Sequence, residues 1–286
     1  MSSEITTAFV NQFSANIQML SQQQGSLLRA CVDEESVTGE KAFFDQVGAV
    51  SAIEKTTRHQ DTPIQDTPHS RRQVSLRDYV YADLIDDEDK IRMLTDPQST
   101  YVRAGAAAMG RRMDDTIIAS AFAAANTGKD GGTSVTFPSG NVVPHGSAGL
   151  TLAKLISAKQ ILDEGSVDPS IKRFIVVAPK QMSDLLNSTT VTSADFNTVR
   201  ALVQGSVTEF CGFTFITSNR LEVNGSSHRR VIAFAQDGLK LAVGMNPTAK
   251  VDVRPDKGYA TQVFYQQSIG ATRMQESMVV EVPCAE

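Results

Sequence analysis

The chain has 286 residues, of which 41% are hydrophobic, and a formal net charge of -5 at pH 7. A chain of this length can form one large domain or two smaller ones and bury a substantial core. The acidic balance argues against a protein that wraps nucleic acid through the release of counterions.

Three cysteines, widely spaced and without a CxxC pair, indicate a reducing compartment such as the cytoplasm: Cys31, Cys211 and Cys284. The chain does not open with a basic region followed by an apolar run. Its longest apolar stretch, residues 117–125, is too short and too rich in alanine to cross a bilayer. We therefore expect neither secretion nor membrane insertion.

Residues 1–45 are polar and rich in Gln, Ser and Thr. Phe9, Phe13, Ile17 and Leu20 recur at steps of three or four, which permits one amphipathic helix. Little else in this segment could anchor it. We interpret it as an N-terminal arm that becomes ordered on contact with neighbours, with a frayed tail as the alternative.

Residues 46–82 predict a long extended arm. The sequence Gln-Asp-Thr-Pro occurs twice at its tip, at 60–63 and 65–68. Each proline lacks a backbone donor and restricts the residue before it to extended geometry, so the tip is neither helix nor central strand. Rough alternation of apolar and polar residues over 47–53 and 74–81 predicts two flanking strands. A two-stranded arm is marginally stable alone, so we expect it to rest on a second copy of the chain.

Charged side chains of both signs follow one another along this arm. Exposed ion pairs contribute only about 0–1 kcal/mol each, yet a repeated set across a symmetric interface can fix register and orientation. A solvated hairpin is the alternative interpretation. The candidate inter-subunit contacts are Arg58, Asp61, Asp66, Arg71, Arg72 and Arg77.

Helices are predicted next. Four acidic residues at 86–89 begin a short helical stretch to Leu94, where the helix dipole favours them. Asp96 can then cap a long helix with Pro97 in its first position. The helix is predicted over about 97–125, roughly 40 Å at 1.5 Å per residue. Its apolar stripe comprises Val102, Ala106, Met109, Met113, Ile117 and Ala121.

The second half of the chain predicts a compact domain of helices and sheet. Glycine-rich residues 126–149 indicate a loop or loose hairpin. Helices are predicted over 152–165, from Pro179, and over 199–203. Strands are predicted at 174–178, 213–217, 251–253, 262–267 and 278–282, and at 231–235 and 239–243 as a hairpin around Asp237-Gly238. The class predicted is α+β.

No motif for catalysis, metal or cofactor binding emerges. Gly128-Lys129 fails the phosphate-loop pattern at positions 123 and 130. The four histidines lack metal-ligand spacing, and the acidic residues 86–89 lack the order of a calcium loop. No GxSxG sequence is present. We expect no cofactor and no enzyme, with a soluble α+β enzyme assembled from scattered residues as the more distant alternative.

The order of these parts resembles the major capsid (coat) proteins of tailed bacteriophages, which have the HK97-like fold. Three stretches resemble such proteins in particular: Tyr79-Val-Tyr-Ala-Asp-Leu-Ile-Asp-Asp-Glu-Asp, Cys211-Gly-Phe-Thr-Phe-Ile-Thr-Ser-Asn-Arg-Leu, and Ser268-Ile-Gly-Ala-Thr-Arg. The resemblance covers nearly the whole chain from about residue 46. It rests on the shared order of elements, because no single motif is diagnostic.

The resemblance implies a domain organisation and a mechanical function. Residues 1–45 would form the N-terminal arm and 46–82 the E-loop, which lies across a neighbouring subunit. The peripheral domain would comprise 83–149 and 251–286, with a spine helix at about 97–125, and the axial domain 150–250. Many copies would assemble through pentamers and hexamers into an icosahedral shell enclosing phage double-stranded DNA. The shell would form in the cytoplasm of the host bacterium and become the virion.

The resemblance also implies partners. Only about 45 residues precede the arm, so we expect a separate scaffolding protein together with a portal, and a decoration protein is a further candidate partner. Some relatives crosslink subunits through Lys and Asn side chains. Lys55 is the only lysine in this arm and no asparagine partner is identifiable, so noncovalent locking is expected. An encapsulin-like bacterial compartment, which encloses protein cargo, is the closest alternative.

Overall fold

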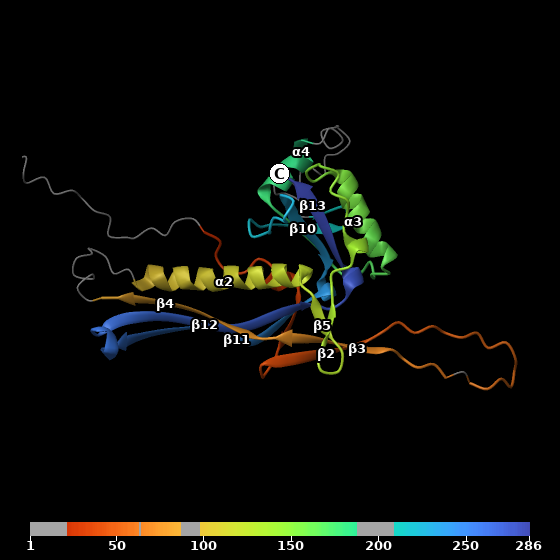
Figure 1. Ribbon diagram of the computed structural model, residues 1–286, viewed down its shortest axis with the longest axis horizontal. Coiled ribbons are helices and arrows are strands. Elements are labelled where there is room, and N and C mark those ends of the chain that lie inside the picture. Colours follow the sequence, from red (N-terminus) through yellow and green to blue (C-terminus); the bar gives the residue numbers. More distant parts are fainter. Residues whose placement is uncertain (1–21, 63, 87–97, 188–208) are drawn as a thin grey trace, which may run out of the picture. The chain divides into compact units, whose positions relative to one another are not determined.

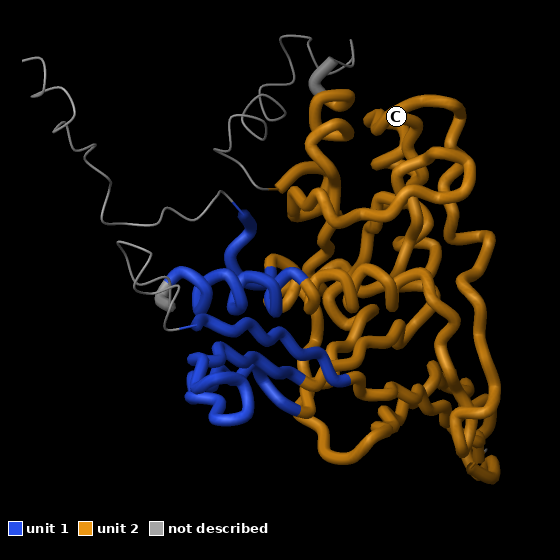
Figure 2. The backbone as a smooth tube through the Cα atoms, turned by 60° about the vertical axis from the view of Figure 1, so that its left-hand side comes forward, with its two compact units in different colours: residues 1–26, 78–111, 245–267 blue, residues 27–77, 112–244, 268–286 orange. Residues whose placement is uncertain are grey.

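The computed structural model describes residues 22–62, 64–86, 98–187 and 209–286. These ranges contain three α-helices and thirteen strands, in one five-stranded and two four-stranded sheets, which confirms the α+β class. The chain divides into two compact units (Figure 2). Unit 1 comprises residues 1–26, 78–111 and 245–267, and unit 2 comprises 27–77, 112–244 and 268–286. No described helix is both long and apolar enough to cross a membrane.

The predicted long helix is present as α2 (Gln98–Phe122), drawn in yellow in Figure 1. Its 25 residues give a length of about 37 Å. Four residues of the predicted stripe, Met109, Met113, Ile117 and Ala121, are each at most 3% exposed, so the apolar periodicity identified the buried face from Met109 onward. Nearer the start of the helix the stripe was wrong at one position, since Ala106 is exposed and Ala107 is buried. The helix ends three residues before the predicted position. Asp96 and Pro97, the predicted cap, lie outside the described residues.

Unit 1 contains most of β4 (Arg77–Ile85), the later part of β11 (Leu239–Arg254) and the first part of β12 (Ala260–Arg273). Its core comprises Ile85, Met109, Val263 and Tyr265, with Tyr81, Tyr101 and Val102 packed around them. Two side chains of β12 donate to carbonyls of α2. The Tyr265 hydroxyl donates to Val102 O at 2.8 Å, and Gln267 Nε2 donates to Met109 O at 3.2 Å.

Two glycines let other groups approach α2 closely. A Cβ on Gly110 would lie 2.3 Å from the carbonyl carbon of Gly25, and one on Gly105 would lie 2.7 Å from the ring of Tyr265. Both distances are shorter than any ordinary van der Waals contact. Each glycine costs about 1 kcal/mol of helix propensity relative to alanine, so the close packing offsets that cost.

In unit 2, a five-stranded sheet has the order β13-β10-β7-β9-β8. Its strands are β7 (Arg173–Val177), β8 (Glu209–Phe210), β9 (Phe213–Thr217), β10 (His228–Ala235) and β13 (Val279–Ala285). The apolar run that predicted β7 is buried at every position, as expected of a central strand. The helices α3 (Leu152–Glu164) and α4 (Pro179–Asn187) confirm two predicted helices, and Thr151 Oγ1 caps α3 by accepting from Lys154 N.

The last strand, β13, pairs antiparallel with β10 over seven residues, from His228↔Ala285 to Phe234↔Val279. The strand predicted at 278–282 is thus confirmed. Its sheet differs from the expectation, which grouped 251–286 with the peripheral domain. β13 is the outer strand of the sheet that also contains 173–177 and 213–217, yet residues 279–284 are all buried, because α3 and residues 139–141 pack against them.

A second sheet of unit 2 has the order β2-β3-β5-β6, from β2 (Lys41–Val47), β3 (His69–Ser75), β5 (Ala125–Thr127) and β6 (Thr133–Val135). The short hairpin of β5 and β6 confirms the loose hairpin predicted within 126–149. Phe44 and Val74 pack with Val37, Ala242 and Met274. The strand β1 (Asp33–Ser36) pairs parallel with β11, so part of the predicted N-terminal arm is ordered as strand within unit 2.

Two strand predictions are wrong. The Asp237-Gly238 pair does not join a hairpin, because β10 pairs with β7 and β13 whereas β11 pairs with β1 and β12. Residues 236–238 form a short 3-10 turn that carries the chain between two sheets, and Gly238 O accepts from Met274 N at 2.9 Å. The second wrong prediction is the strand at 47–53: β2 ends at Val47, and residues 48–53 are not in a strand.

Three other strand predictions are confirmed. Residues 251–253 lie within β11, 262–267 within β12, and 213–217 form β9. The helices predicted from Phe9 to Leu20 and over 199–203 lie outside the described residues, as does all of the helix predicted over 86–94 except its first residue.

We predict that Gly110→Ala destabilises the protein by about 1–3 kcal/mol, because the added Cβ meets backbone atoms of Gly25 and overpacking outweighs the gain in helix propensity. The free energy of unfolding from chemical denaturation measures the change. Gly132→Ala is the matched control, since a Cβ there meets nothing within 4 Å. Equal stability of the two variants would contradict the close approach.

Candidate subunit-contact loop

The loop of residues 48–68 joins β2 to β3 and leaves the sheet as an extended excursion (Figure 1). Its base is closed by the last register pair, Val47↔His69, and by Gly48 N donating to Pro68 O at 2.8 Å. A Cβ on Gly48 would lie 2.7 Å from Pro68 Cγ, so a larger residue would force this closure apart. The two strands are therefore zipped up to the point where the loop begins.

Beyond its base the loop has no core of its own. Every described residue from 48 to 68 is exposed. The hydrogen bonds of its side chains are local: Gln60 Oε1 accepts from Thr56 N at 3.0 Å, and Gln65 Nε2 reaches Ser51 Oγ at 3.5 Å. Such bonds bend the chain without burying it. Contacts with another chain would bury the side chains that the loop leaves exposed in its own subunit.

Apolar side chains on and beside the loop are unusually accessible. Ile64 at the tip is 93% exposed, Val47 and Val50 are 64% exposed, and Ile53 is 51% exposed. Burying one such side chain is worth about 1.5–3 kcal/mol. Four apolar side chains exposed on or beside one extended loop can all be buried by a partner that contacts the loop.

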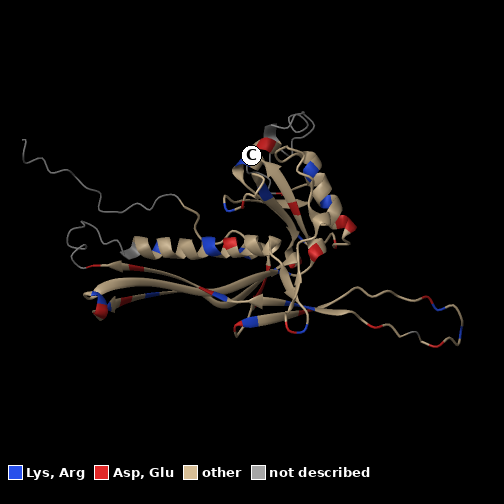
Figure 3. Cartoon of the chain, in the orientation of Figure 1, with Lys and Arg blue, Asp and Glu red and all other residues tan. Residues whose placement is uncertain are grey.

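Three of the predicted contact residues lie on the loop itself. Arg58, Asp61 and Asp66 are exposed, and none of the three forms an ion pair with another described residue of the chain. Figure 3 shows both signs of charge along the loop. Arg77, at the start of β4, is also exposed and forms no ion pair within the described part of the chain. These four side chains are available to a partner.

Arg71 is partly engaged within the chain. Its Nε donates to Asp45 Oδ1 at 2.7 Å across the β2–β3 pair, and its guanidinium lies 5.5 Å from the ring centroid of Phe43. The hydrogen bond from Arg71 holds the pKa of Asp45 below its usual value. Because the pair is solvent-exposed, it fixes the side-chain geometry more than it stabilises the fold.

Arg72 has a different place from the others. Its side chain is 8% exposed, its Nη2 donates to both carboxylate oxygens of Glu276 at 2.7 Å, and its Nε donates to Met274 O at 3.0 Å. The adjacent Gln46 Nε2 donates to the same carbonyl at 2.9 Å. Arg72 therefore anchors the base of the loop within its own subunit.

Sequence reasoning missed Glu276, which lies 204 residues from Arg72. Arg273 approaches the same carboxylate, at 3.8 Å, and donates from Nη1 to Ala121 O and Ala123 O at 2.8 and 3.0 Å. Burial lowers the pKa of Arg273, and the charge of Glu276 opposes that shift. No local pattern in the sequence could have joined Arg72 to this carboxylate, because the two side chains meet only in the folded chain.

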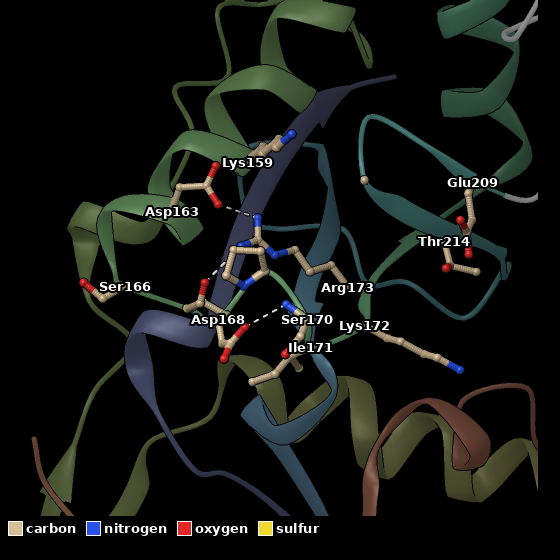
Figure 4. A pocket seen from close by; sticks show the side chains of 13 residues that line it. Lys159, Asp163, Ser166, Asp168, Ser170, Ile171, Lys172, Arg173, Glu209 and Thr214 are labelled. Carbon is tan, nitrogen blue, oxygen red and sulfur yellow. Dashed lines mark hydrogen bonds and ion pairs between the residues drawn. The ribbon is translucent and has the colours of Figure 1, made fainter.

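A cavity of about 700 Å³ in unit 2 is the main alternative to a contact loop as the functional site (Figure 4). Asp163 and Arg173 form an ion pair at 2.7 Å in its wall, and Asp168 accepts from Ser170 N at 2.8 Å. That backbone hydrogen bond lowers the pKa of Asp168, which keeps the carboxyl ionised. Two of the lining carboxylates, Asp163 and Asp168, are thus engaged by donors of the same wall, and neither is left to act as an acid or base in catalysis.

Among the described residues, no group of three or more His, Cys, Asp or Glu side chains could hold a metal ion. The three cysteines are free thiols, and burial raises the pKa of Cys284 to about 11. Neither finding assigns a reaction to the chain. The exposed loop 48–68 and its buried base are the arrangement that a functional interpretation has to explain.

A family model described as phage capsid protein matches residues 5–286. No curated protein matched the chain. Solved structures share the fold at low identity. One from Mycobacterium phage Che8 is 17% identical, with a TM-score of 0.72, covering 96% of this chain and 97% of that one.

Two further similar structures are capsids. The capsid of Ralstonia phage GP4 is 11% identical with a TM-score of 0.75, covering 96% of this chain and 94% of that one. The capsid asymmetric unit of cyanophage Pam1 is 14% identical with a TM-score of 0.73, covering 98% and 97%. Likeness over almost the whole of each chain confirms the HK97-like fold predicted from the order of elements.

We predict that Glu276→Gln lowers the free energy of unfolding by about 2–4 kcal/mol, because it leaves Arg72 and Arg273 buried without a negative partner. Chemical denaturation measures the loss. Asp45→Asn, which breaks the exposed pair with Arg71, is the control and should leave stability unchanged. A similar effect of the two substitutions would show that the buried cluster does not anchor the loop.

Proposed function

Since this chain belongs to the phage capsid protein family, we propose that its copies assemble through pentamers and hexamers into an icosahedral shell that encloses phage double-stranded DNA. The chain is a structural major capsid protein and a component of the virion. Capsids are built from multiple copies, so the chain's main partner is itself. The family is structural and is not a class of enzymes.

The observation that carries the mechanism is the loop 48–68, which is exposed throughout and attached to a buried base. The loop is an E-loop that lies across a neighbouring subunit and buries its apolar side chains there. Arg58, Asp61, Asp66 and Arg77 then set its position by ion pairs, whereas Arg72 acts within the subunit. Arg71 pairs with Asp45 of its own subunit, so it contributes to the interface only where the neighbouring subunit contacts that ion pair.

The domain assignment follows from the same proposal. Residues 1–45 form the N-terminal arm, 46–82 the E-loop, 83–149 and 251–278 the peripheral domain, and 150–250 the axial domain. Unit 1 supports a peripheral domain that is discontinuous in sequence, because it combines 78–111 with 245–267. We revise one boundary: residues 279–286 join the axial domain, since β13 completes the sheet that contains β7 and β10.

The remaining partners are also proposals. A net charge of -5 favours a shell that contains DNA without sequence-specific binding. A separate scaffolding protein, a portal and a decoration protein would complete the particle, which assembles in the host bacterial cytoplasm. Lys55 is exposed and is the one lysine of the arm, so we propose that the E-loops lock noncovalently.

The alternatives are less well supported. An encapsulin-like compartment would share the fold, but the family match is to phage capsid proteins over nearly the whole chain. An enzyme with a scattered site lacks support from the cavity of Figure 4, where Asp163 is paired with Arg173 and Asp168 accepts from Ser170. Packaged DNA rather than protein cargo in purified particles distinguishes the first alternative from our proposal.

Replacing residues 50–66 with a short Gly/Ser turn should leave a folded subunit and abolish particle formation, because the loop contributes contacts only between subunits. Thermal unfolding tests the fold, and negative-stain microscopy of the chain expressed with its scaffolding protein tests assembly. Shortening the β5–β6 turn at 128–132 is the control. An unfolded loop variant would place the loop in the subunit core and refute the mechanism.

Ile64→Ser should leave the unfolding temperature unchanged and weaken assembly, since Ile64 is 93% exposed in the subunit and its burial is worth about 1.5–3 kcal/mol per contact. The protein concentration at which particles first appear measures the effect. Val223→Ser is a matched control, an apolar side chain 45% exposed elsewhere in unit 2. Equal assembly of Ile64→Ser and the unaltered chain would remove the loop tip from the interface.

A further inference from the structure

Among the described residues, no strand covers one edge of β11 beyond Val243. In the order β1-β11-β12-β4, β11 lies between β1 and β12, but β1 pairs only with Lys240–Val243, through the register Asp33↔Lys240 to Ser36↔Val243. Residues 247–253, farther along β11, are all exposed. An extended strand of this length with an open edge is a template for another strand.

Proline indicates which backbone groups this edge presents. Within a sheet, proline is confined to positions whose nitrogen faces away from the ladder, because it has no N–H to donate. Pro247 therefore turns the odd-numbered positions toward the open edge, so Ala249, Val251 and Val253 present their N–H and C=O groups there. The even-numbered positions face β12.

The side chains of this segment divide by charge between the two faces. Lys250, Asp252 and Arg254 share one face, where they line a shallow cavity with Gln262 and Phe264 of β12. Val251 and Val253 point to the opposite face and are 39% and 55% exposed. Along the edge, a basic residue (Lys250) and an acidic residue (Asp252) therefore flank an exposed valine (Val251).

That alternation is complementary to itself. When two copies of the strand pair antiparallel about a two-fold axis at Val251, Lys250 of each copy lies opposite Asp252 of the other. Val251 then faces Val251, and Ala249 exchanges hydrogen bonds with Val253. Pro247 lies opposite Pro255, so pairing stops at both ends where neither residue has a donor to leave unsatisfied.

Neighbouring symmetric registers lack this match. In an antiparallel pair, two opposed residues either both direct their N–H and C=O groups toward the other strand or both direct them away. Every symmetric register therefore places one residue opposite its own copy, and shifting the register by one step moves the two-fold axis to the next residue. A step in one direction sets Lys250 opposite Lys250, and a step in the other sets Asp252 opposite Asp252. Like charges directly opposite destabilise a pair of strands. Lys250 also disfavours unrelated strands, as charged edge residues commonly do.

We propose that residues 247–255 of two subunits pair edge to edge, antiparallel, with Val251 on the two-fold axis. The partner is a second copy of this chain, and the inference rests on the proposed function because it joins subunits of the same shell. It adds a contact through backbone hydrogen bonds to the contact that the loop 48–68 makes through side chains.

A cysteine on the axis tests the pairing. In a hydrogen-bonded antiparallel pair, opposed Cα atoms lie about 5.5 Å apart, within the range of a disulfide. Val251→Cys, in a Cys211→Ser background, should give a disulfide-linked dimer on mild oxidation. Cys31 and Cys284 do not compete, since both are buried and burial raises the pKa of each thiol.

Val253→Cys in the same background is the matched control. Its two copies would be offset by four residues, about 14 Å along the strands, so the dimer band should be lost. A dimer formed by Lys250→Cys or Asp252→Cys rather than by Val251→Cys would identify another register and overturn the proposal. Hydrogen-exchange protection of 249–253 without the Val251→Cys dimer would also overturn it, because another segment would then cover the edge.

Charge exchange gives a second, independent readout. Lys250→Glu should reduce the yield of dimer from Val251→Cys, and adding Asp252→Lys should restore it, because the two-fold pair again joins opposite charges. Microscopy of the same preparations separates this proposal from the assembly function. Particles without the dimer overturn the edge pairing alone, a dimer without particles overturns the shell function alone, and the absence of both overturns both.

Discussion

Two buried guanidinium groups that share one carboxylate hold the base of the exposed loop. Arg72 comes from β3, and Arg273 and Glu276 come from the end of β12 and the turn after it. Arg273 is fully buried and also donates to the last carbonyls of α2, where the helix dipole favours a cation. A buried cation without its partner is strongly destabilising, so this cluster constrains β3, β12 and the end of α2 together. The loop can extend into solvent because its two ends are fixed there.

The sequence was informative wherever local pattern and burial coincide. The stripe containing Met109, Met113 and Ile117 identified α2, and the run at 174–178 identified a central strand. The order of elements was enough to indicate the HK97-like fold. These features follow from periodicity, which depends only on which face of an element is buried.

Where two sheets meet, local pattern failed. Asp237-Gly238 has the composition of a tight hairpin turn, yet it links β10 to β11 in a different sheet. Which strand lies beside which is decided by packing between residues far apart in sequence, as when β13 takes the place next to β10. A turn motif specifies the direction of the backbone but does not choose the partner of the strand that follows.

The same limit explains the candidate site. Six charged residues of the arm were grouped by their spacing, and the structure separates them by burial. Four of them, Arg58, Asp61, Asp66 and Arg77, are exposed. Arg71 pairs with Asp45, and Arg72 is buried and pairs with Glu276. Charge alternation along an extended segment indicates that ion pairs will form. It does not tell which belong to the subunit and which to its neighbour, because distant acids such as Glu276 compete for the same arginines.

The loop and the strand edge are suited to different kinds of contact. A loop laid across a neighbour is heterologous: each copy offers the loop and receives another, so the contact continues from subunit to subunit. An antiparallel edge pair is isologous and is satisfied by two copies. A closed shell needs contacts that propagate around a ring and contacts that join one ring to the next. One extended loop with a rigid base and one self-complementary strand edge would supply both kinds from a single chain, without covalent links.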